Sequence, residues 1–427
     1  MTVSASFFPT SPTVSQSSPG GRRGTMVAMC CECMRRSMRF LPPACKIVSI
    51  CCAKGNVAIS VMPMTSHKRM ASYKSIVRQV LSIPTASFQE QCVADCVRRL
   101  ATQWGYVVRE TPDGNLLVGR QVAHQNPKLM LLSHMDHPAL KILNVSGKVA
   151  RVGVMGGLPL DQLVGAQFLF VSGDDKTTGR VRRKLKTQWM GQPEFEVHLK
   201  KEIASGGFAT LDVPSPQWRG DRLSARAIDN LANVAGLLCL LWSERHNRRS
   251  RLLCVFTRAE EVGMVGTSAL IHRNTLSKKI PLIVLEASSA IGGKVAIGGG
   301  PVIRVGDRVA TYDPSIDLWL QDVVAKLSAH NKKLQSQRAL LAGGRCEATV
   351  FFAHGYRVGG LALPLGNYHN RGARRLETEF ISWKDFVGLQ ELLQQILKHP
   401  FSEKQLRRHQ QWGFVHYYNR WKSKLRA

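Results

Sequence analysis

The chain has 427 residues, 44% of them hydrophobic, and it carries 59 Lys plus Arg against 29 Asp plus Glu, a formal net charge of +30. This length and apolar content suffice for one large domain with an insertion, or for two domains, and exclude a chain that is disordered throughout. The positive charge favours anionic partners, but it also follows from the shortage of acids, so charge alone does not select nucleic acid.

The first 70 residues form a basic extension rich in Cys and Met. They hold six of the eleven cysteines and eight of the thirteen methionines, with Glu32 as the only acid, in a spacing that matches neither a disulfide framework nor a zinc ribbon. A targeting segment, a disordered arm and an extension upstream of a start near Met62, Met64 or Met70 are the three alternatives, and we favour an extension that is disordered or not translated. No uncharged apolar run reaches the ~18 residues of a membrane span, so we expect a cytoplasmic protein without membrane contact.

Residues 71–139 predict a helix followed by three strands. Ser87 as N-cap, Glu90 three residues later and Gly105 as a stop frame a segment with apolar residues at helical spacing. YVVRE, LLVGR and LMLLS follow as strands, the first two joined by the turn TPDGN. Together with residues 222–400, this part is predicted to form a catalytic α/β domain.

Residues 140–221 change character. Short alternating segments such as VARVGVM, AQFLFVS and EFEVHL are separated by Gly, Asp and Pro, which predicts an inserted small β-barrel or sandwich domain. From residue 222 to 400, the helical patterns DNLANVAGLLCLLWSER, SIDLWLQDVVAKLSAH and WKDFVGLQELLQQILK, the last capped by Ser382, alternate with the strands LLCVFT and LIVLE. This alternation predicts an α/β fold with a mixed, largely parallel sheet covered by helices.

Residues 401–427 form a basic aromatic tail with seven Lys or Arg and six aromatic residues. Such a segment could stack on and neutralise single-stranded nucleic acid. We favour the alternative that its aromatics pack on the domain and leave a solvated basic face, because composition is the only support for nucleic acid.

Side chains that bind metals follow the predicted strands. In LMLLSHMDHPAL a buried strand leads into two polar residues at positions i and i+2, which point to the same face of an extended chain. Because the carboxyl ends of strands in open α/β sheets gather functional residues, we expect the whole set to converge. Its members are His134 and Asp136 after LMLLS, Glu260 and Glu261 after LLCVFT, Glu286 after LIVL, His369 after LALPL, and Asp229 at the start of the helix DNLANV.

Each of these residues alone has an ordinary alternative. His134 could be a buried core histidine, Asp229 an N-cap, and the Glu pair first-turn acids on a helix dipole. Jointly these alternatives are strained, because all must hold at strand ends at once. Two divalent ions about 4 Å apart need a bridging carboxylate, mixed nitrogen and oxygen ligands and room for water, and this set of side chains supplies them. One member of the Glu pair can ligate while its neighbour acts as general base.

From about residue 72 to 398, the ordered motifs SHMDH, ARAIDNLANVAG, TRAEEVGMVG, VLEAS and LPLGNYHN resemble the dinuclear zinc aminopeptidases that assemble into tetrahedral particles. This family, which includes glutamyl and deblocking aminopeptidases and members misnamed endoglucanases, belongs to the co-catalytic zinc exopeptidases. The resemblance implies two metal sites that share the carboxylate of Asp229. His134 and Glu286 would complete one site, and Glu261 and His369 the other.

The resemblance also implies the activity: a metal-dependent aminopeptidase that hydrolyses N-terminal residues from peptides through a two-metal-activated water. Glu260 would accept the proton of that water, and Asp136 would fix the imidazole of His134. A cis peptide after Asp229 and a homo-oligomer that forms through residues 140–221 are further implications. The cofactors would be two divalent metal ions, zinc by the resemblance, although cobalt or manganese would accept the same ligands.

Two alternative functions remain open. One is a carboxypeptidase or deacylase on the same scaffold, which the position of the insertion, between His134 and Asp229, makes the weaker interpretation. The other is a non-catalytic, basic nucleic-acid-binding protein. Where members of the family commonly read Glu-Ile-Gly after HMD, this chain has His137, Pro138 and Ala139, and we interpret His137 as incidental rather than as a ligand.

Overall fold

The computed structural model describes residues 48–53, 56–61, 66–120, 127–331, 335–340 and 344–425. It divides into two units, Met1–Arg69 and Met70–Ala427. In the first unit, β1 (Val48–Ala53) and β2 (Asn56–Val61) form an antiparallel hairpin. Most of the predicted extension lies outside the described residues, and its interpretation stays a prediction.

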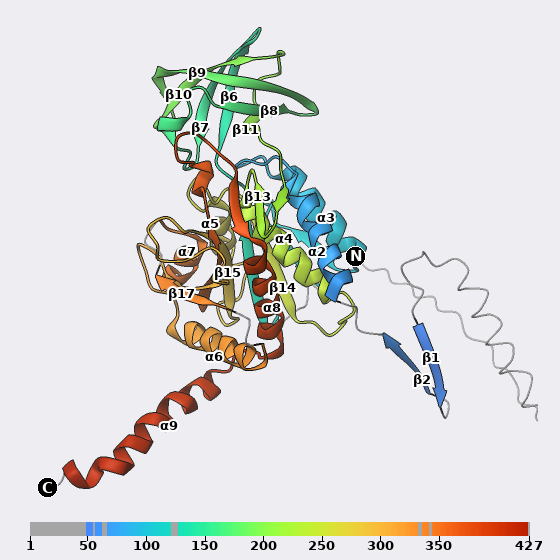
Figure 1. Ribbon diagram of the computed structural model, residues 1–427, viewed down its shortest axis with the longest axis vertical. Coiled ribbons are helices and arrows are strands. Elements are labelled where there is room, and N and C mark those ends of the chain that lie inside the picture. The colour runs from blue at the N-terminus through green and yellow to red at the C-terminus, as the bar shows by residue number, and fades with distance from the viewer. Residues whose placement is uncertain are drawn as a thin grey trace, which may run out of the picture. The chain divides into compact units, whose positions relative to one another are not determined.

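The second unit is built on an eight-stranded sheet of order β17-β16-β18-β15-β5-β14-β4-β3 (Figure 1). Neighbours among the four central strands run parallel, whereas β4 is antiparallel to β14 and β16 is antiparallel to β18. The predicted mixed, largely parallel sheet is therefore confirmed. The strands are β3 (Val107–Glu110), β4 (Leu116–Gly119), β5 (Leu129–His134), β14 (Leu252–Thr257), β15 (Leu282–Ser289), β16 (Val302–Gly306), β17 (Gln337–Leu340) and β18 (Val358–Leu365).

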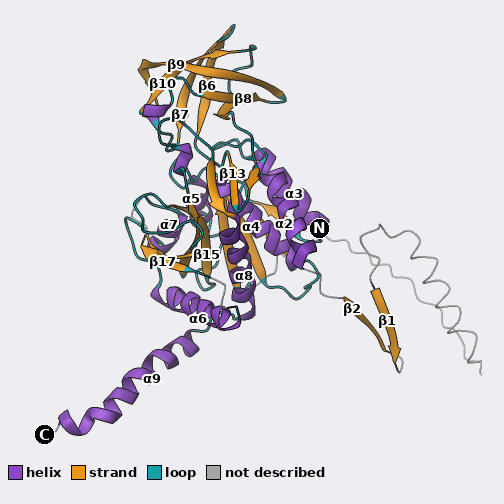
Figure 2. Cartoon of the chain, viewed as in Figure 1, coloured by secondary structure: helices purple, strands orange, loops and turns teal. Residues whose placement is uncertain are grey.

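Helices cover both faces of this sheet (Figure 2). On β5, Leu129 and Leu131 belong to the core cluster with α2, α3, α4, α6 and α8, whereas Met130 and Leu132 belong to the cluster with α5 and α7. A strand buried on both faces needs an unbroken apolar run, which is why LMLLS shows no alternation. The helices are α2 (Ser66–Leu81), α3 (Gln91–Gln103), α4 (Ile228–Ser243), α5 (Val265–His272), α6 (Pro314–His330), α7 (Glu347–Ala353) and α8 (Trp383–Lys398).

One of the two predicted helix caps is confirmed and the other is wrong. Ser382 caps α8, since its Oγ accepts the backbone N–H of Asp385 at 3.2 Å. Helix α3 begins directly after Glu90, which is its N-cap residue, and not after Ser87. The Ser87 hydroxyl instead donates to Asp136 at 2.7 Å, a partner that lies far away in the sequence. A tertiary contact has replaced the local cap.

The inserted segment forms a closed six-stranded barrel of order β10-β7-β6-β11-β8-β9 with its own core, which includes Phe168, Phe170 and Phe195. The predicted inserted β-barrel is confirmed as an architecture. It begins five residues after His134, so its first strand continues the segment that carries this residue. The strands are β6 (Ala139–Ser146), β7 (Val149–Met155), β8 (Gln167–Ser172), β9 (Asp175–Trp189), β10 (Gln192–Leu199) and β11 (Phe208–Leu211).

Three short strands return the chain to the main sheet. β12 (Gln217–Arg219), β13 (Arg222–Ala225) and β19 (Glu379–Ser382) form an antiparallel sheet, in which Ala225 lies opposite Glu379. Two 3-10 turns, η3 (Leu160–Gln162) and η4 (Tyr368–Asn370), complete this region. The small sheet therefore brings the segment before Asp229 beside the segment after His369.

The tail forms α9 (Glu403–Trp421) and the 3-10 turn η5 (Lys422–Leu425). Phe401 and Leu406 pack against the main core. The side chains of Phe414, Tyr417, Tyr418 and Trp421 are more than half exposed, so the prediction that the tail aromatics pack on the domain is wrong for these four. Within the described part of the chain, no helix is long and apolar enough to cross a membrane. Nucleic-acid binding by the tail, the alternative that the sequence did not favour, is not tested by the structure.

Candidate metal centre

The predicted ligands meet at the carboxyl ends of the central strands. In the parallel pair β5 and β14, Thr257 lies opposite His134, so the residues after β14 emerge beside this imidazole. Next to β5, β15 carries Glu286, and the turn after β18 carries His369. All five predicted ligands and Glu260 line one cavity of about 680 Å³. The predicted ligands therefore lie close together, as the interpretation of the sequence requires.

Asp229 lies between the two imidazoles. Its Oδ1 is 3.4 Å from Nε2 of His134, and its Oδ2 is 3.9 Å from Nε2 of His369. The two oxygens of one carboxylate therefore face two different histidines, which is the arrangement that a carboxylate shared by two cations requires.

Each imidazole has a further carboxylate on its Nε2 side. Glu286 Oε2 is 3.8 Å from Nε2 of His134, and Glu261 Oε2 is 3.3 Å from Nε2 of His369. Ligand atoms of His134, Asp229 and Glu261 all lie within 4.8 Å of one another. The side chains thus form two sets of one nitrogen and two oxygen donors that have Asp229 in common.

Several of these buried ligand atoms lack a hydrogen-bond partner among the described residues: Asp229 Oδ1, Glu261 Oε1, Glu286 Oε1 and His369 Nε2. More than about 90% of buried polar groups are hydrogen-bonded, and one without a partner costs roughly 1–3 kcal/mol. Divalent cations would satisfy these atoms together, and a mixed nitrogen and oxygen donor set suits zinc and its neighbours. The residues therefore fit a pair of divalent cations.

Negative charge accumulates in this cluster. Burial, with repulsion from Glu261 and Glu286, raises the pKa of Glu260 well above that of an ordinary carboxyl. Burial lowers the pKa of His369, but Glu261 and Asp229 outweigh it and raise this pKa to about 9. In the same way Asp136, Asp229 and Glu286 overcome burial at His134 and raise its pKa. The carboxylates thus demand positive charge, which either protons on the imidazoles or cations can supply.

An oxygen lies on the far side of each ring. Nδ1 of His134 is 3.4 Å from Oδ1 of Asp136, an ion-pair contact without hydrogen-bond geometry. Nδ1 of His369 is 3.1 Å from the carbonyl of Gly157. A Cβ atom at Gly157 would lie 2.5 Å from Nδ1 of His369, so this segment of the inserted domain needs glycine. Both rings therefore present Nε2 to Asp229.

Glu260 and Glu261 both line the cavity, although neighbouring residues of a strand point to opposite faces. They lie beyond the end of β14, and Ala259 before them has φ of 52°, so strand alternation does not apply. Asp136 holds their turn, since its Oδ1 accepts the backbone N–H of Glu260 at 3.0 Å and its Oδ2 that of Glu261 at 3.1 Å. Glu90 holds the preceding residue, with Oε1 accepting the N–H of Ala259 at 2.9 Å.

His137 is not incidental, although it is not among the candidate ligands. Its Nδ1 contacts the carbonyl of Asp229, and its Nε2 lies 3.1 Å from Oδ1 of Asn370. The peptide after Asp229 is cis, as the family resemblance implied. The buried imidazole therefore links the backbone of Asp229 to Asn370 in the turn that contains His369.

Sequence reasoning missed two further groups. Glu379 accepts the backbone N–H groups of Asp229 and His369. The sequence offered one indication of its role: Glu379 is one of only 29 acidic residues, and it follows the motif LPLGNYHN closely. Basic side chains also line the cavity, and the guanidinium of Arg304 is buried on β16, with no ion pair among the described residues and Nε without a hydrogen-bond partner. Lys294 and Arg345 are the other two.

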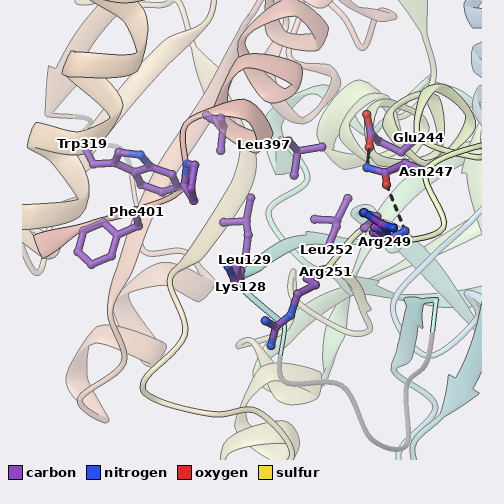
Figure 3. Close-up of a pocket in the computed structure, with 13 residues that line it drawn as sticks. Lys128, Leu129, Glu244, Asn247, Arg249, Arg251, Leu252, Trp319, Leu397 and Phe401 are labelled. Atoms are coloured by element: carbon purple, nitrogen blue, oxygen red, sulfur yellow. Dashed lines mark hydrogen bonds between the residues drawn. The ribbon is translucent and has the colours of Figure 1, made fainter. Parts of the chain in front are cut away.

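A second cavity, of about 270 Å³, lies where β5 and β14 begin. Trp319 and Phe401, in edge-to-face contact with ring centroids 5.6 Å apart, line one side, and Arg249 lies on the other (Figure 3). None of the predicted site residues lines it. The two cavities therefore lie at opposite ends of the same strands, and only the one at the carboxyl ends gathers the candidate ligands.

Comparisons with known proteins agree with this fold. Residues 190–376 match the model of a family described as M42 glutamyl aminopeptidase. A curated protein of Acetivibrio thermocellus, named "Putative aminopeptidase", is 23% identical over 272 residues, which cover 60% of this chain and 79% of that protein.

Solved structures share the fold at low identity. Aminopeptidase APDkam598 from the archaeon Desulfurococcus kamchatkensis has a TM-score of 0.63 at 19% identity, over 77% of this chain and 95% of its own. The Pyrococcus horikoshii TET1 peptidase, whose structure is described as able to assemble into a tetrahedron or a large octahedral shell, has a TM-score of 0.60 at 18% identity, over 76% of this chain and 99% of its own. The family resemblance and the fold class expected from the sequence are both confirmed.

Proposed function

We propose that this chain, which resembles the M42 glutamyl aminopeptidases in its motifs and its fold, is an aminopeptidase that uses two divalent cations, zinc in the first instance. The observation that carries the proposal is the position of Asp229, whose two oxygens face Nε2 of His134 and Nε2 of His369. Glu286 would complete the first cation site and Glu261 the second.

When bound, the two cations would supply Lewis acidity toward the scissile carbonyl and lower the pKa of the attacking water. Glu260 is proposed as the general base. It lines the cavity and makes no ion pair with either imidazole among the described residues. Burial, with Glu261 and Glu286, raises its pKa, and the charge of bound cations would lower that pKa toward the range in which a carboxylate accepts a proton near neutral pH. It would take the proton of the water and pass it to the departing amine, while Asp136 keeps its backbone in place.

The same carboxylates provide a reason for cleavage at chain ends. A free α-amino group can donate hydrogen bonds, and the oxygen of Glu286 that is not bound to a cation would accept one. An internal peptide bond offers no amino group at this position. We therefore propose that the substrate class is peptides with an unblocked N-terminus.

The first residue of the substrate is proposed to be acidic. Lys294, Arg304 and Arg345 line the cavity, and the buried guanidinium of Arg304 has no ion pair among the described side chains. Glu286 and Asp307 act on this guanidinium from beyond ion-pair distance. A Glu or Asp side chain of the substrate would add a direct bidentate partner, which an apolar side chain would not.

A homo-oligomer that forms through residues 140–221 is proposed as well. The barrel segments carry exposed large apolar side chains, namely Val149, Leu160, Val164 and Met190. Single exposed residues are ordinary, but several on one small domain favour an interface. Native mass spectrometry would test this, because Met190→Lys should shift the chain toward smaller assemblies if the barrel is the contact.

Hydrolysis of glutamyl anilide by purified protein tests the activity. Chelator treatment should abolish turnover and Zn²⁺ should restore it, while acetylation of the substrate's α-amine should prevent cleavage. Turnover of the acetylated substrate, or of a peptide blocked at its N-terminus but free at its C-terminus, would favour a deacylase or a carboxypeptidase on the same scaffold. Full turnover in chelator would rule out the cation-dependent mechanism.

A further inference from the structure

The turn that carries His369 is held in an unusual backbone conformation. Asn367, His369 and Asn370 have φ of 56°, 54° and 63°. Residues other than glycine occupy this left-handed region sparsely, Asn and His more often than most, and three in one short turn need support from their surroundings. The position of the His369 imidazole therefore depends on contacts made by its backbone.

Glu379 makes such a contact, and it does so with two candidate ligands at once. Its Oε1 accepts the backbone N–H of His369 at 2.8 Å, and its Oε2 accepts the backbone N–H of Asp229 at 2.9 Å. Glu379 is fully buried at the start of β19, where it pairs with Ala225 just before the Asp229 segment. One carboxylate thus joins two segments that are remote in the sequence.

We propose that Glu379 is a positioning residue that fixes the spacing between Asp229 and His369, and with it the second cation site. This inference rests on the proposed function. Glu379 does not line the cavity, so it acts through the two ligands and not on substrate. Glu379 and its two hydrogen bonds to backbone N–H groups form what we call the clamp. The clamp fixes the backbone positions of Asp229 and His369, and the side-chain conformation of each residue then determines where its ligand atoms point.

The chemistry of the clamp requires a carboxylate. Each of its two oxygens accepts a backbone N–H, and a carboxylate is the side chain that offers an acceptor at both positions. A glutamine would offer one acceptor and one NH₂ donor, and the donor would face a backbone N–H. The change is nearly isosteric, so it disturbs the hydrogen bonds and not the packing.

Other bonds keep the turn of His369 folded without Glu379. The side-chain amide of Asn370 donates to the carbonyl of Arg226 at 2.8 Å and to that of Glu377 at 3.1 Å. His137 contacts the carbonyl of Asp229. A variant at Glu379 should therefore fold while the spacing of the two ligands loosens.

Calorimetric titration of Zn²⁺ into chelator-treated protein tests the proposal. We expect two binding events in the wild type and, in Glu379→Gln, a loss of roughly 10–100-fold in affinity for the weaker one, the magnitude typical of residues that orient metal ligands. Glu377→Gln is the matched control. It makes the same chemical change two residues away, where the carboxylate accepts, among the described residues, only a 3.5 Å bond from Asn367, and it should bind both cations like the wild type.

Visible absorption of the Co²⁺-loaded proteins adds a readout that a merely structural role would not move, since its intensity follows coordination geometry. Wild-type affinity and spectrum in Glu379→Gln would overturn the proposal, even if the variant melts at a lower temperature. Should Glu379→Gln not fold, Glu379→Asp decides: its shorter side chain cannot reach both N–H groups, and undiminished affinity would equally overturn the clamp. A wild-type protein that binds no cation pair would refute the proposed function, and the clamp with it.

Discussion

Oδ1 of Asp136 accepts the backbone N–H of Glu260 at 3.0 Å, so the carboxylate that lies against the imidazole of His134 also fixes the residue proposed as general base. Its Oδ2 accepts the N–H of Glu261 and the hydroxyl of Ser87. Burial would raise the pKa of Asp136, but the contact with His134 outweighs it, lowers this pKa and keeps the group ionised. One buried carboxylate therefore couples a candidate ligand and the candidate base.

Asp136→Asn should lower kcat/KM for glutamyl anilide by roughly 10–100-fold, the range found for partners of metal-binding histidines. The amide has one acceptor, so either Glu260 or Glu261 loses its backbone partner. Ser87→Ala is the control, because it removes one hydroxyl and leaves both oxygens of Asp136 on their N–H groups. It should cost less than Asp136→Asn, because both backbone N–H groups keep their acceptors on Asp136. Steady-state kinetics measure both variants. A kcat/KM of Asp136→Asn equal to or higher than that of Ser87→Ala would contradict this role of Asp136.

Glu260→Gln should lower kcat by roughly 10²–10⁴, the usual contribution of a general base, while Zn²⁺ affinity stays that of the wild type. Glu261→Gln, the same change at the next residue, should instead weaken Zn²⁺ binding, because its carboxylate faces Nε2 of His369 at 3.3 Å. Kinetics and calorimetric titration on the same preparations separate the two roles. If Glu260→Gln loses cations and Glu261→Gln does not, the assignments are reversed.

Arg304→Met should lower kcat/KM for glutamyl anilide by roughly 10–100-fold, the value of a hydrogen bond to a charged group, and leave alanyl anilide little changed. Methionine keeps the apolar stem and removes the charge. Arg371→Met is a suitable control, because this guanidinium pairs with Asp161 at 2.8 Å and does not line the cavity. Equal losses on both substrates would mean that Arg304 supports the site without selecting acidic residues.

Glu347 predicts a dependence of stability on pH. Burial, with Glu286, raises its pKa from 4.5 to about 7, so the folded state holds its proton over a range in which the unfolded chain has lost it. The free energy of unfolding must therefore fall as pH rises from about 4.5 to about 7, by about 3 kcal/mol from this group. Glu347→Gln should remove that part of the fall, since the amide can still accept the bond from Thr267.

Urea unfolding of chelator-treated protein at pH 5 and pH 8 measures this difference. The gap between the two pH values should be smaller in Glu347→Gln than in the wild type, and unchanged in Glu202→Gln, an exposed position on the inserted segment. An unaltered gap in Glu347→Gln would show that this carboxyl is not the group that titrates.

Sequence alone determined the kinds of element and the places where ligands begin. LMLLS, LLCVFT and LIVL are unbroken apolar runs because strands covered on both faces have no solvent side, and a polar residue directly after such a run must emerge at the strand's end. The short alternating segments between His134 and Asp229 predicted the barrel, because a strand with one buried and one solvated face alternates apolar and polar residues. These patterns depend on neighbours along the chain.

Only the tertiary structure decided how the ligands are held. Ser87 and Glu90 have the spacing of a local helix cap, yet they bind Asp136 and the Ala259 segment. The partners of His137 and Glu379 lie equally far away in the sequence. A buried polar group needs a hydrogen-bond partner, and in the folded chain that partner can come from a remote segment. The spacing of residues along the chain does not identify it. The ligands could therefore be predicted from strand ends, whereas the carboxylates and the imidazole that position them could be identified only once remote segments had met.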